Sequence, residues 1–205
     1  MKNQIPKIKS KWISWFVTLC FGVAGFGGFP QASYAQKRVL NEAGRVEYTG
    51  NILYIGGRRG ATATTFSVRL DRFTPAPQVE NILNALRNGG QDQLMKTIEK
   101  EKLGTIQIGT QLGRDINAAW ISEEEEGHKL TILFERWLGF SELRYGARSL
   151  DYPFTYLEMY LDDNGKGEGS LIPAARVRYK KGNTIEVENF GIYPARLTNI
   201  TTQRR

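Results

Sequence analysis

The chain has 205 residues, a formal net charge of +7, one histidine and one cysteine. One cysteine and one histidine exclude disulfide frameworks, zinc sites built from several Cys or His ligands, and two-histidine chemistry. A chain of this length buries roughly two-thirds of its unfolded surface, so a single domain of this size can be stable without disulfide cross-links.

The first 35 residues have the pattern of a secretory signal. Four lysines precede an apolar stretch at 12–29, and Ser33-Tyr34-Ala35 offers small side chains for cleavage. We expect residues 1–35 to be a secretory signal peptide and residues 36–205 a single β-rich domain, secreted or periplasmic. Cys20 lies inside the signal, so the expected mature domain has no thiolate nucleophile and no cysteine metal site.

Cleavage also changes the charge balance. Removal of the four lysines leaves 24 basic and 21 acidic residues, a net charge of +3 with both signs interspersed. Such a balance does not favour nucleic acid as a partner. We expect contact with a membrane only through the signal segment before cleavage.

Apolar and polar residues begin to alternate at Val46, which predicts a strand as far as Tyr54. Gly50 within it indicates a bulge or a close approach of another backbone. Gly56 to Gly60 reads as a turn. The run from Thr62 to Phe73 predicts a half-buried strand. Its buried face holds Phe66, Val68 and Leu70.

The period then changes to a helical one. Thr74-Pro75 is suited to cap and start a helix, and Asn88-Gly89-Gly90 is suited to end it. A second short helix follows, and together they make a helical excursion over 75–102. The apolar stripes, expected to face the core, are Val79, Ile82, Leu83 and Leu86 in the first helix, and Leu94, Met95 and Ile98 in the second.

From Gly104 onward the alternation resumes. Strands are predicted at 105–108, 115–121, 129–137, 156–161, 171–179, 184–190 and 195–200. The pattern predicts an α+β fold, mainly an antiparallel β sandwich or barrel of eight or nine short strands with one helical excursion.

The hairpin from Arg176 to Glu188 has a predicted register. A three-residue loop at 181–183 pairs Tyr179 with Ile185 and Val177 with Val187, so that apolar residues share the buried face. The same register places Arg178 opposite Glu186 and Arg176 opposite Glu188, and Asn183 takes the left-handed position.

The segment from Asp162 to Glu168 resembles a calcium loop at first sight. Lys166, however, stands where the fifth position needs an oxygen ligand, and Pro173 stands where the bidentate glutamate belongs. Asn164-Gly165 between two alternating runs is a strong hairpin signal, so we interpret the segment as a turn and expect no metal site there.

The stretch from Phe134 to Tyr160 is the most aromatic in the chain. Flat apolar rings beside guanidinium donors suit a binding surface. The alternative is that the rings fill the core and the charges face water. The candidate ligand-binding residues are Arg136, Trp137, Tyr145, Arg148 and Tyr152.

The whole expected mature chain resembles a group of exported bacterial proteins of unknown function that are associated with acidobacteria. The resemblance is strongest in three segments, Arg69–Phe73, Gly89–Asp92 and Arg148–Phe154. The resemblance implies export from a bacterium and implies no activity.

We therefore expect an exported soluble binding or accessory protein, with no catalytic residues and no cofactor. Its partner is expected to be a small molecule, a glycan or a protein. The alternative is a secreted hydrolase that acts on glycans through two carboxylates. The acids near the aromatic segment are Glu135, Glu142, Asp151 and Glu158.

Overall fold

The computed structural model describes residues 45–57, 60–124, 127–136, 148–181, 184–191 and 193–204. The predicted signal peptide and most of the turn loop predicted at 181–183 lie outside these ranges. No helix within them is long and apolar enough to cross a membrane.

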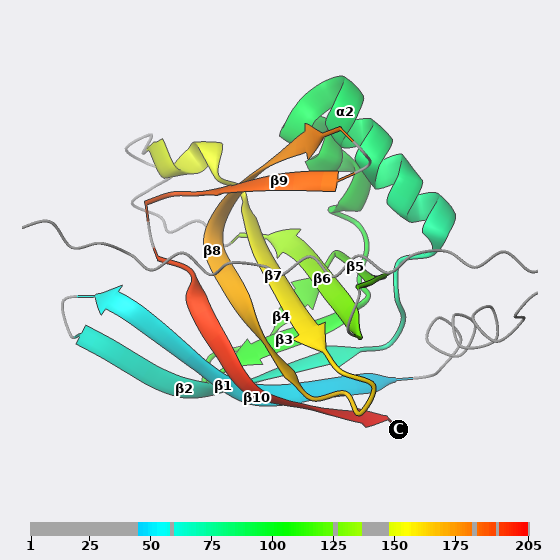
Figure 1. Ribbon diagram of the computed structural model, residues 1–205. Helices are drawn as coiled ribbons and strands as arrows, with labels where there is room; N and C mark the ends of the chain where they lie inside the picture. The colour runs from blue at the N-terminus through cyan, green and yellow to red at the C-terminus, as the bar shows by residue number, and fades with distance from the viewer. Residues whose placement is uncertain are drawn as a thin grey trace, which may run out of the picture.

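Within these residues, ten strands form one antiparallel sheet and one long helix packs against it, which confirms a mainly antiparallel α+β fold (Figure 1). The elements are β1 (Val46–Gly57), β2 (Gly60–Leu70), α2 (Ala76–Ile98), β3 (Gly104–Ile108), β4 (Arg114–Ile116), β5 (Ala118–Glu123), β6 (His128–Glu135), η1 (Arg148–Asp151), β7 (Phe154–Leu161), β8 (Gly167–Lys180), β9 (Thr184–Asn189) and β10 (Ala195–Arg204).

The sheet curls round on itself without closing. Its order is β4-β3-β2-β1-β10-β8-β7-β6-β5, with β9 added beside β8. The end strands β4 and β5 are separated in the chain by Asn117 alone, so the two ends of the sheet meet there without pairing. The prediction of one continuous strand over 115–121 is therefore wrong.

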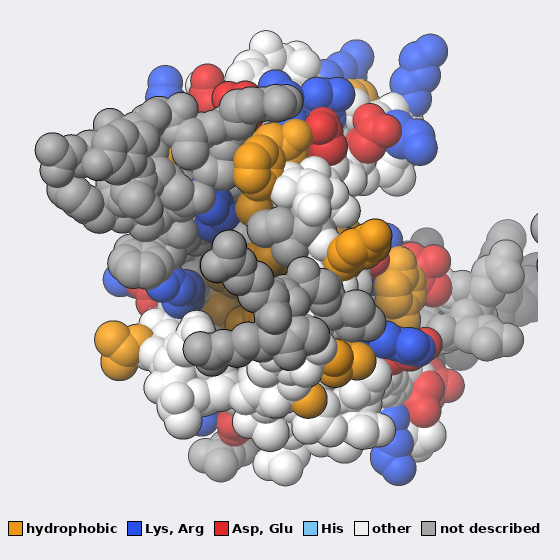
Figure 2. Space-filling model, turned by 90° about the vertical axis from the view of Figure 1, so that its left-hand side faces the viewer, with side chains coloured by type: hydrophobic (Ala, Val, Ile, Leu, Met, Phe, Trp, Pro, Cys, Tyr) orange, Lys and Arg blue, Asp and Glu red, His pale blue; other side chains and the backbone are white. Residues whose placement is uncertain are grey.

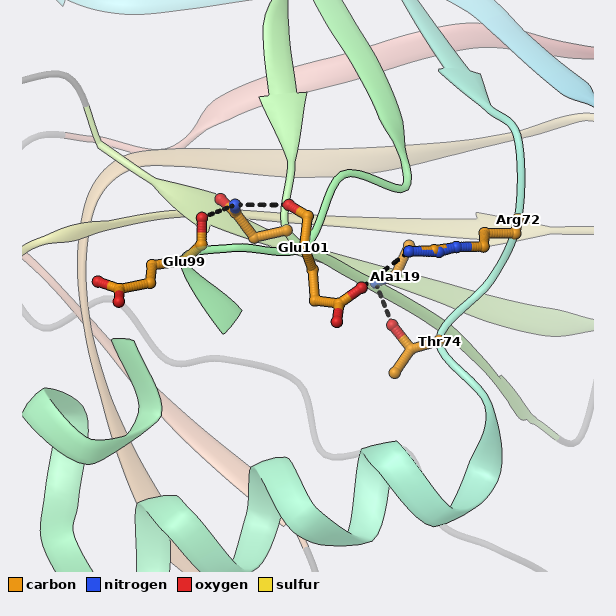
Figure 3. Close-up of polar contacts among 6 residues, drawn as sticks. Arg72, Thr74, Glu99, Glu101 and Ala119 are labelled. Atoms are coloured by element: carbon orange, nitrogen blue, oxygen red, sulfur yellow. Dashed lines mark hydrogen bonds and ion pairs between the residues drawn. The ribbon is translucent and has the colours of Figure 1, made fainter. Parts of the chain in front are cut away.

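The side chain of Asn117 bridges this opening and is 7% exposed. Its Nδ2 donates to the carbonyl of Glu101 at 3.0 Å and, more weakly, to that of Glu99 at 3.5 Å (Figure 3). Its Oδ1 accepts from the main-chain N–H of Glu135 at 2.9 Å. One amide thus joins the α2–β3 connection to β6, which gives a physical reason for the break in the strand.

The interior of the curled sheet is an apolar core. Side chains from every strand except β9 enter it, and Ile52, Val68, Ile132, Leu157 and Leu197 are fully buried. The burial of Phe66, Val68 and Leu70 confirms the predicted face of the second strand.

The helix covers the outer face of the sheet. Ile82, Leu86, Leu94 and Ile98 are buried in a second cluster with side chains of β5 to β8, and Met95 packs against it, which confirms these positions of the predicted stripes. Val79 and Leu83 are only partly buried and do not belong to this cluster. A kink with φ 66° at Gly90 divides α2 where the sequence predicts the end of the first helix.

The start of the helix differs from the prediction. The residue before α2 is Pro75, and no side chain caps the helix. Thr74 does not cap it, because its Oγ1 accepts a hydrogen bond from the N–H of Ala119 in β5 at 2.9 Å.

The register predicted for the β8–β9 hairpin is confirmed. Tyr179 pairs with Ile185, Val177 with Val187, Arg178 with Glu186 and Arg176 with Glu188. The guanidinium of Arg178 also lies 3.2 Å from the Glu188 carboxylate, diagonally across the ladder. The predicted left-handed position of Asn183 lies outside the described residues.

The predicted turn between β7 and β8 is also confirmed. The Asp162 N–H donates to the Lys166 carbonyl at 2.8 Å, and the Gly165 N–H donates to the Asp162 carbonyl at 2.9 Å. The Asp162 Oδ1 accepts the N–H groups of Asn164 and Lys166, both at 2.9 Å. One oxygen of this carboxylate is thus engaged within its own turn.

Candidate functional site

Two of the predicted binding residues come together next to β9. Arg136 follows β6, and its Nε donates to the Tyr152 carbonyl at 3.0 Å. The Tyr152 hydroxyl donates to Glu188 Oε1 at 2.7 Å, and its ring lies 5.1 Å from that of Phe190, centre to centre. These contacts connect the end of β6 to β9 through the segment that precedes β7.

The other predicted binding residues are not placed with this pair. Trp137 and Tyr145 lie outside the described residues. The backbone of Arg148 begins η1, but the structure does not describe its side chain. The hypothesis that the five residues form a ligand surface stays a prediction.

Two carboxylates of the hydrolase hypothesis, Glu135 and Glu158, lie on the β6–β7 ladder, and Asp151 lies in η1. Glu135 pairs with Phe154 and Thr131 pairs with Glu158, so the two acids stand four ladder positions apart, roughly 13 Å. Paired glycosidase carboxylates stand about 5–10 Å apart. Glu142 lies outside the described residues.

Glu158 also has partners of its own on the outer face. It accepts hydrogen bonds from the Tyr156 hydroxyl at 3.1 Å and from Ser170 Oγ at 3.3 Å. Burial, and then the neighbouring Glu158 charge, raise the pKa of Tyr156 above its usual value. This phenol therefore stays protonated and serves as a donor to the carboxylate.

A pocket of about 160 Å³ opens at the end of the curled sheet where β1 turns into β2. We call it the mouth pocket. Its walls come from β1, β3, β4, β6, β7 and β8, on both sides of the interior. The described residues that line it are Tyr54, Ile106, Ile108, Gln111, Leu112, Arg114, Phe134, Thr155, Leu171 and Pro173. Figure 2 looks at the molecule from this side and shows recessed apolar side chains with Lys or Arg side chains near them.

The floor of the mouth pocket is apolar and its polar groups are few. Ile106, Phe134 and Leu171 belong to the interior core, and Ile108 and Tyr54 pack against it. Burial raises the pKa of the Tyr54 hydroxyl, which therefore remains a protonated donor. Apolar walls with a few placed polar groups are typical of small-molecule sites in the mouths of β-barrels.

The rim of the mouth pocket is the loop between β3 and β4. Gly109 begins it with φ 55°, and its N–H donates to the Thr65 carbonyl at 2.8 Å. The Gln111 N–H then donates to the Ile108 carbonyl at 3.1 Å. This tight loop presents Leu112 with 92% of its surface exposed at the edge of the pocket.

Two other hollows have different chemistry. One lies over the bulge at Gly50 and is lined mainly by hydroxyl and amide side chains such as Thr49, Asn51 and Ser67. The other lies beside the β7–β8 turn, next to Asn199, which has a φ of 53°. In the described ranges, no group of three His, Cys, Asp or Glu residues is placed to hold a metal ion.

None of the mouth-pocket residues is among the predicted ligand-binding residues, although Phe134 and Thr155 lie in the aromatic segment from Phe134 to Tyr160. Tyr54 and Arg114 stand far apart in the chain, and no local pattern marks them as neighbours. The one local signal was an apolar residue, Leu112, in a short loop that begins and ends with glycine. No protein-family model, curated protein or solved structure matches this chain.

Proposed function

We propose that this chain is an exported, non-catalytic binding protein that takes a small ligand with an apolar body into the mouth pocket. The observation that supports this most is the composition of the pocket. Most of its lining is apolar, and its polar residues are few: Gln111 and Arg114 at the rim loop and the start of β4, Tyr54 on β1 and Thr155 on β7. In this proposal the curled sheet acts as an incomplete barrel with the pocket at its open end.

The size of the mouth pocket limits the ligand. A volume of about 160 Å³ is close to that of an engineered apolar cavity of about 150 Å³ that binds benzene. The group that enters is therefore one ring or a short branched chain, and any larger part of the ligand stays outside.

The export part of the proposal depends on the signal pattern at 1–35. Expression of the full chain in a bacterium, followed by intact-mass measurement of the exported protein, tests it. A mass that starts at Gln36 supports export with cleavage. A retained lysine-rich start contradicts it.

Binding is tested with benzyl alcohol as a neutral probe, followed by NMR. Ile108→Trp places a larger side chain at the pocket wall. Because the indole fills part of the pocket, the variant is expected to bind the probe about tenfold more weakly or worse. Ile185→Trp, at a half-buried site on β9 outside the pocket, is the matched control and is expected to leave binding unchanged. Absence of binding to the wild type, or equal weakening by both folded variants, would overturn the proposal.

A further inference from the structure

Two hollows on the outer face of the sheet have one residue in common. The first, of about 460 Å³, lies over Gly50, and the second, of about 610 Å³, lies beside the β7–β8 turn. Asn199 lines both. Together they cross the neighbouring strands β3, β2, β1, β10 and β8, and four strand spacings come to about 19 Å. We call the two hollows together the outer groove. In Figure 1, β1, β2 and β10 lie at the opposite end of the molecule from α2.

An extra residue in β10 stands where the two hollows meet. Thr198 and Asn199 lie opposite Glu168 alone in β8. Asn199 and Ile200 lie opposite Gly50 alone in β1. Asn199 is therefore the extra residue relative to both neighbouring strands, and among the described non-glycine residues it is the one with a positive φ, 53°. Bulges and strained backbone of this kind are frequent next to functional sites, where they redirect a side chain. Here the bulge presents an exposed amide between the two hollows.

The lining of the outer groove is rich in hydroxyl and amide groups. Neighbouring positions on four adjacent strands form one row across the sheet, made of Thr201, Thr49, Ser67 and Gln107. The hydroxyl oxygens of Thr49 and Thr201 lie 3.1 Å apart and share one hydrogen bond. A hydroxyl has one donor and two acceptor positions, and a side-chain amide both donates and accepts. The row therefore keeps the capacity to donate to and accept from a ligand.

The charges at the outer groove are few and mostly paired within the protein. Among the described residues that line it, Lys166 and Glu168 are the ionised ones, and Glu168 pairs with Arg196 at 3.0 Å. Beside the row of hydroxyl and amide groups, Arg69 pairs with Glu47 at 3.1 Å. Lys166 lies at one end of the groove, next to the β7–β8 turn. A charged ligand therefore gains little here over a neutral one with many hydroxyl groups.

We propose that the outer groove binds a neutral oligosaccharide of several units, laid across the strands with Asn199 near its centre. Sugar hydroxyls both donate and accept hydrogen bonds, so they complement the hydroxyl and amide side chains without any charge. The length of the groove favours a chain over a single sugar. The site is separate from the mouth pocket, so this inference goes beyond the binding function proposed above and does not depend on it.

Three neutral trisaccharides are the probes: cellotriose, maltotriose and triacetylchitotriose. At least one is expected to bind the wild type and to shift the backbone NMR signals of Thr49, Ser67 and Asn199. Glucose is expected to bind about tenfold more weakly than the tightest trisaccharide, because it can make fewer of the hydrogen bonds. Anionic trigalacturonate and the cationic trimer of glucosamine are expected to bind no more tightly than the neutral chains.

Asn199→Gly removes the amide and keeps a residue that adopts a positive φ readily. It is expected to weaken binding of the tightest trisaccharide about threefold to tenfold, as the loss of one or two neutral hydrogen bonds does. Asn189→Gly, at an exposed position on β9 outside the groove, is the matched control and is expected to leave binding unchanged. Thr49→Val keeps the side-chain shape and removes one hydroxyl of the row, with a similar expected loss. Circular dichroism checks that each variant is folded.

Several results would overturn the inference. It is wrong if none of the three neutral trisaccharides binds, if a charged trisaccharide binds more tightly than all of them, or if the signals that shift lie outside the groove. It is also wrong if Asn199→Gly binds as tightly as the wild type, or if Asn189→Gly weakens binding equally. If Asn199→Gly does not fold, Thr49→Val decides in its place. Benzyl alcohol binding is measured on the same wild-type sample, and its absence would contradict the mouth-pocket function alone.

Discussion

Thr74 and Ala119 exchange two hydrogen bonds across 45 residues of chain. The Thr74 N–H donates to the Ala119 carbonyl at 2.7 Å. In return, Thr74 Oγ1 accepts from the Ala119 N–H at 2.9 Å (Figure 3). Both residues are buried. Ala119 lies on β5, the end strand of the sheet, so Thr74 satisfies backbone groups that have no neighbouring strand there.

Thr74→Val keeps the shape of the side chain and removes the acceptor for the Ala119 N–H. Loss of the acceptor leaves a buried donor unsatisfied, which is expected to lower the free energy of unfolding by about 1–3 kcal/mol. Thr74→Ser keeps the hydroxyl and is expected to cost less. Urea denaturation measures both, and equal stability of the valine and serine variants would contradict the role of the hydroxyl.

Asn117→Ala removes the amide that bridges the open side of the sheet. The Glu135 N–H then loses its acceptor and the Glu101 carbonyl its donor, so we expect a loss of about 2–4 kcal/mol. Asn189→Ala changes an exposed asparagine on β9 and is expected to stay within about 0.5 kcal/mol of the wild type. A similar small effect at Asn117 would show that the bridge is dispensable.

Gly50→Ala tests the predicted close approach at this glycine. An added Cβ would lie 2.9 Å from Phe66 Cε1 and 2.9 Å from the Thr198 carbonyl oxygen, so overpacking is expected to cost about 1–3 kcal/mol. Gly113→Ala is the matched control, because its nearest neighbour would be 3.8 Å away. Thermal melting of the two variants compares them, and equal melting temperatures would contradict the close approach.

The ionisation of Asp162 is expected to make the free energy of unfolding depend on pH in the acid range. Hydrogen bonds from the N–H groups of Lys166 and Asn164 lower the pKa of Asp162 below its usual value of 3.8. The unfolded chain therefore takes up the proton first as the pH falls. The stability that the charged form contributes is present above about pH 4 and is lost as the pH falls through the lower, folded-state pKa.

Asp162→Asn should flatten the dependence of unfolding free energy on pH below about pH 4. NMR titration of the Asp162 carboxyl group provides a direct measurement. Titration of Asp162 at or above its usual value would contradict the account of the turn.

The sequence by itself determined the local features of this fold. The β8–β9 register follows from the alternation of Val177, Tyr179, Ile185 and Val187, because a shift of β9 by one residue would turn Ile185 and Val187 away from the face that Val177 and Tyr179 share. The break in the helix at Gly90 follows equally from a glycine that adopts a φ closed to most residues. In both cases the residues that set the geometry are close together in the chain.

The tertiary structure alone decided how these pieces combine. β10 pairs with both β1 and β8, and this long-range pairing curls the sheet so that its two ends meet at Asn117. The strand predicted through that residue breaks because its amide bonds to the chain after α2 and to β6, contacts that no periodicity reports. Tyr54 and Arg114 line one pocket for the same reason. A curled sheet places side chains from distant strands around one interior. Their proximity therefore depends on the order of the strands in the sheet and not on their spacing in the sequence.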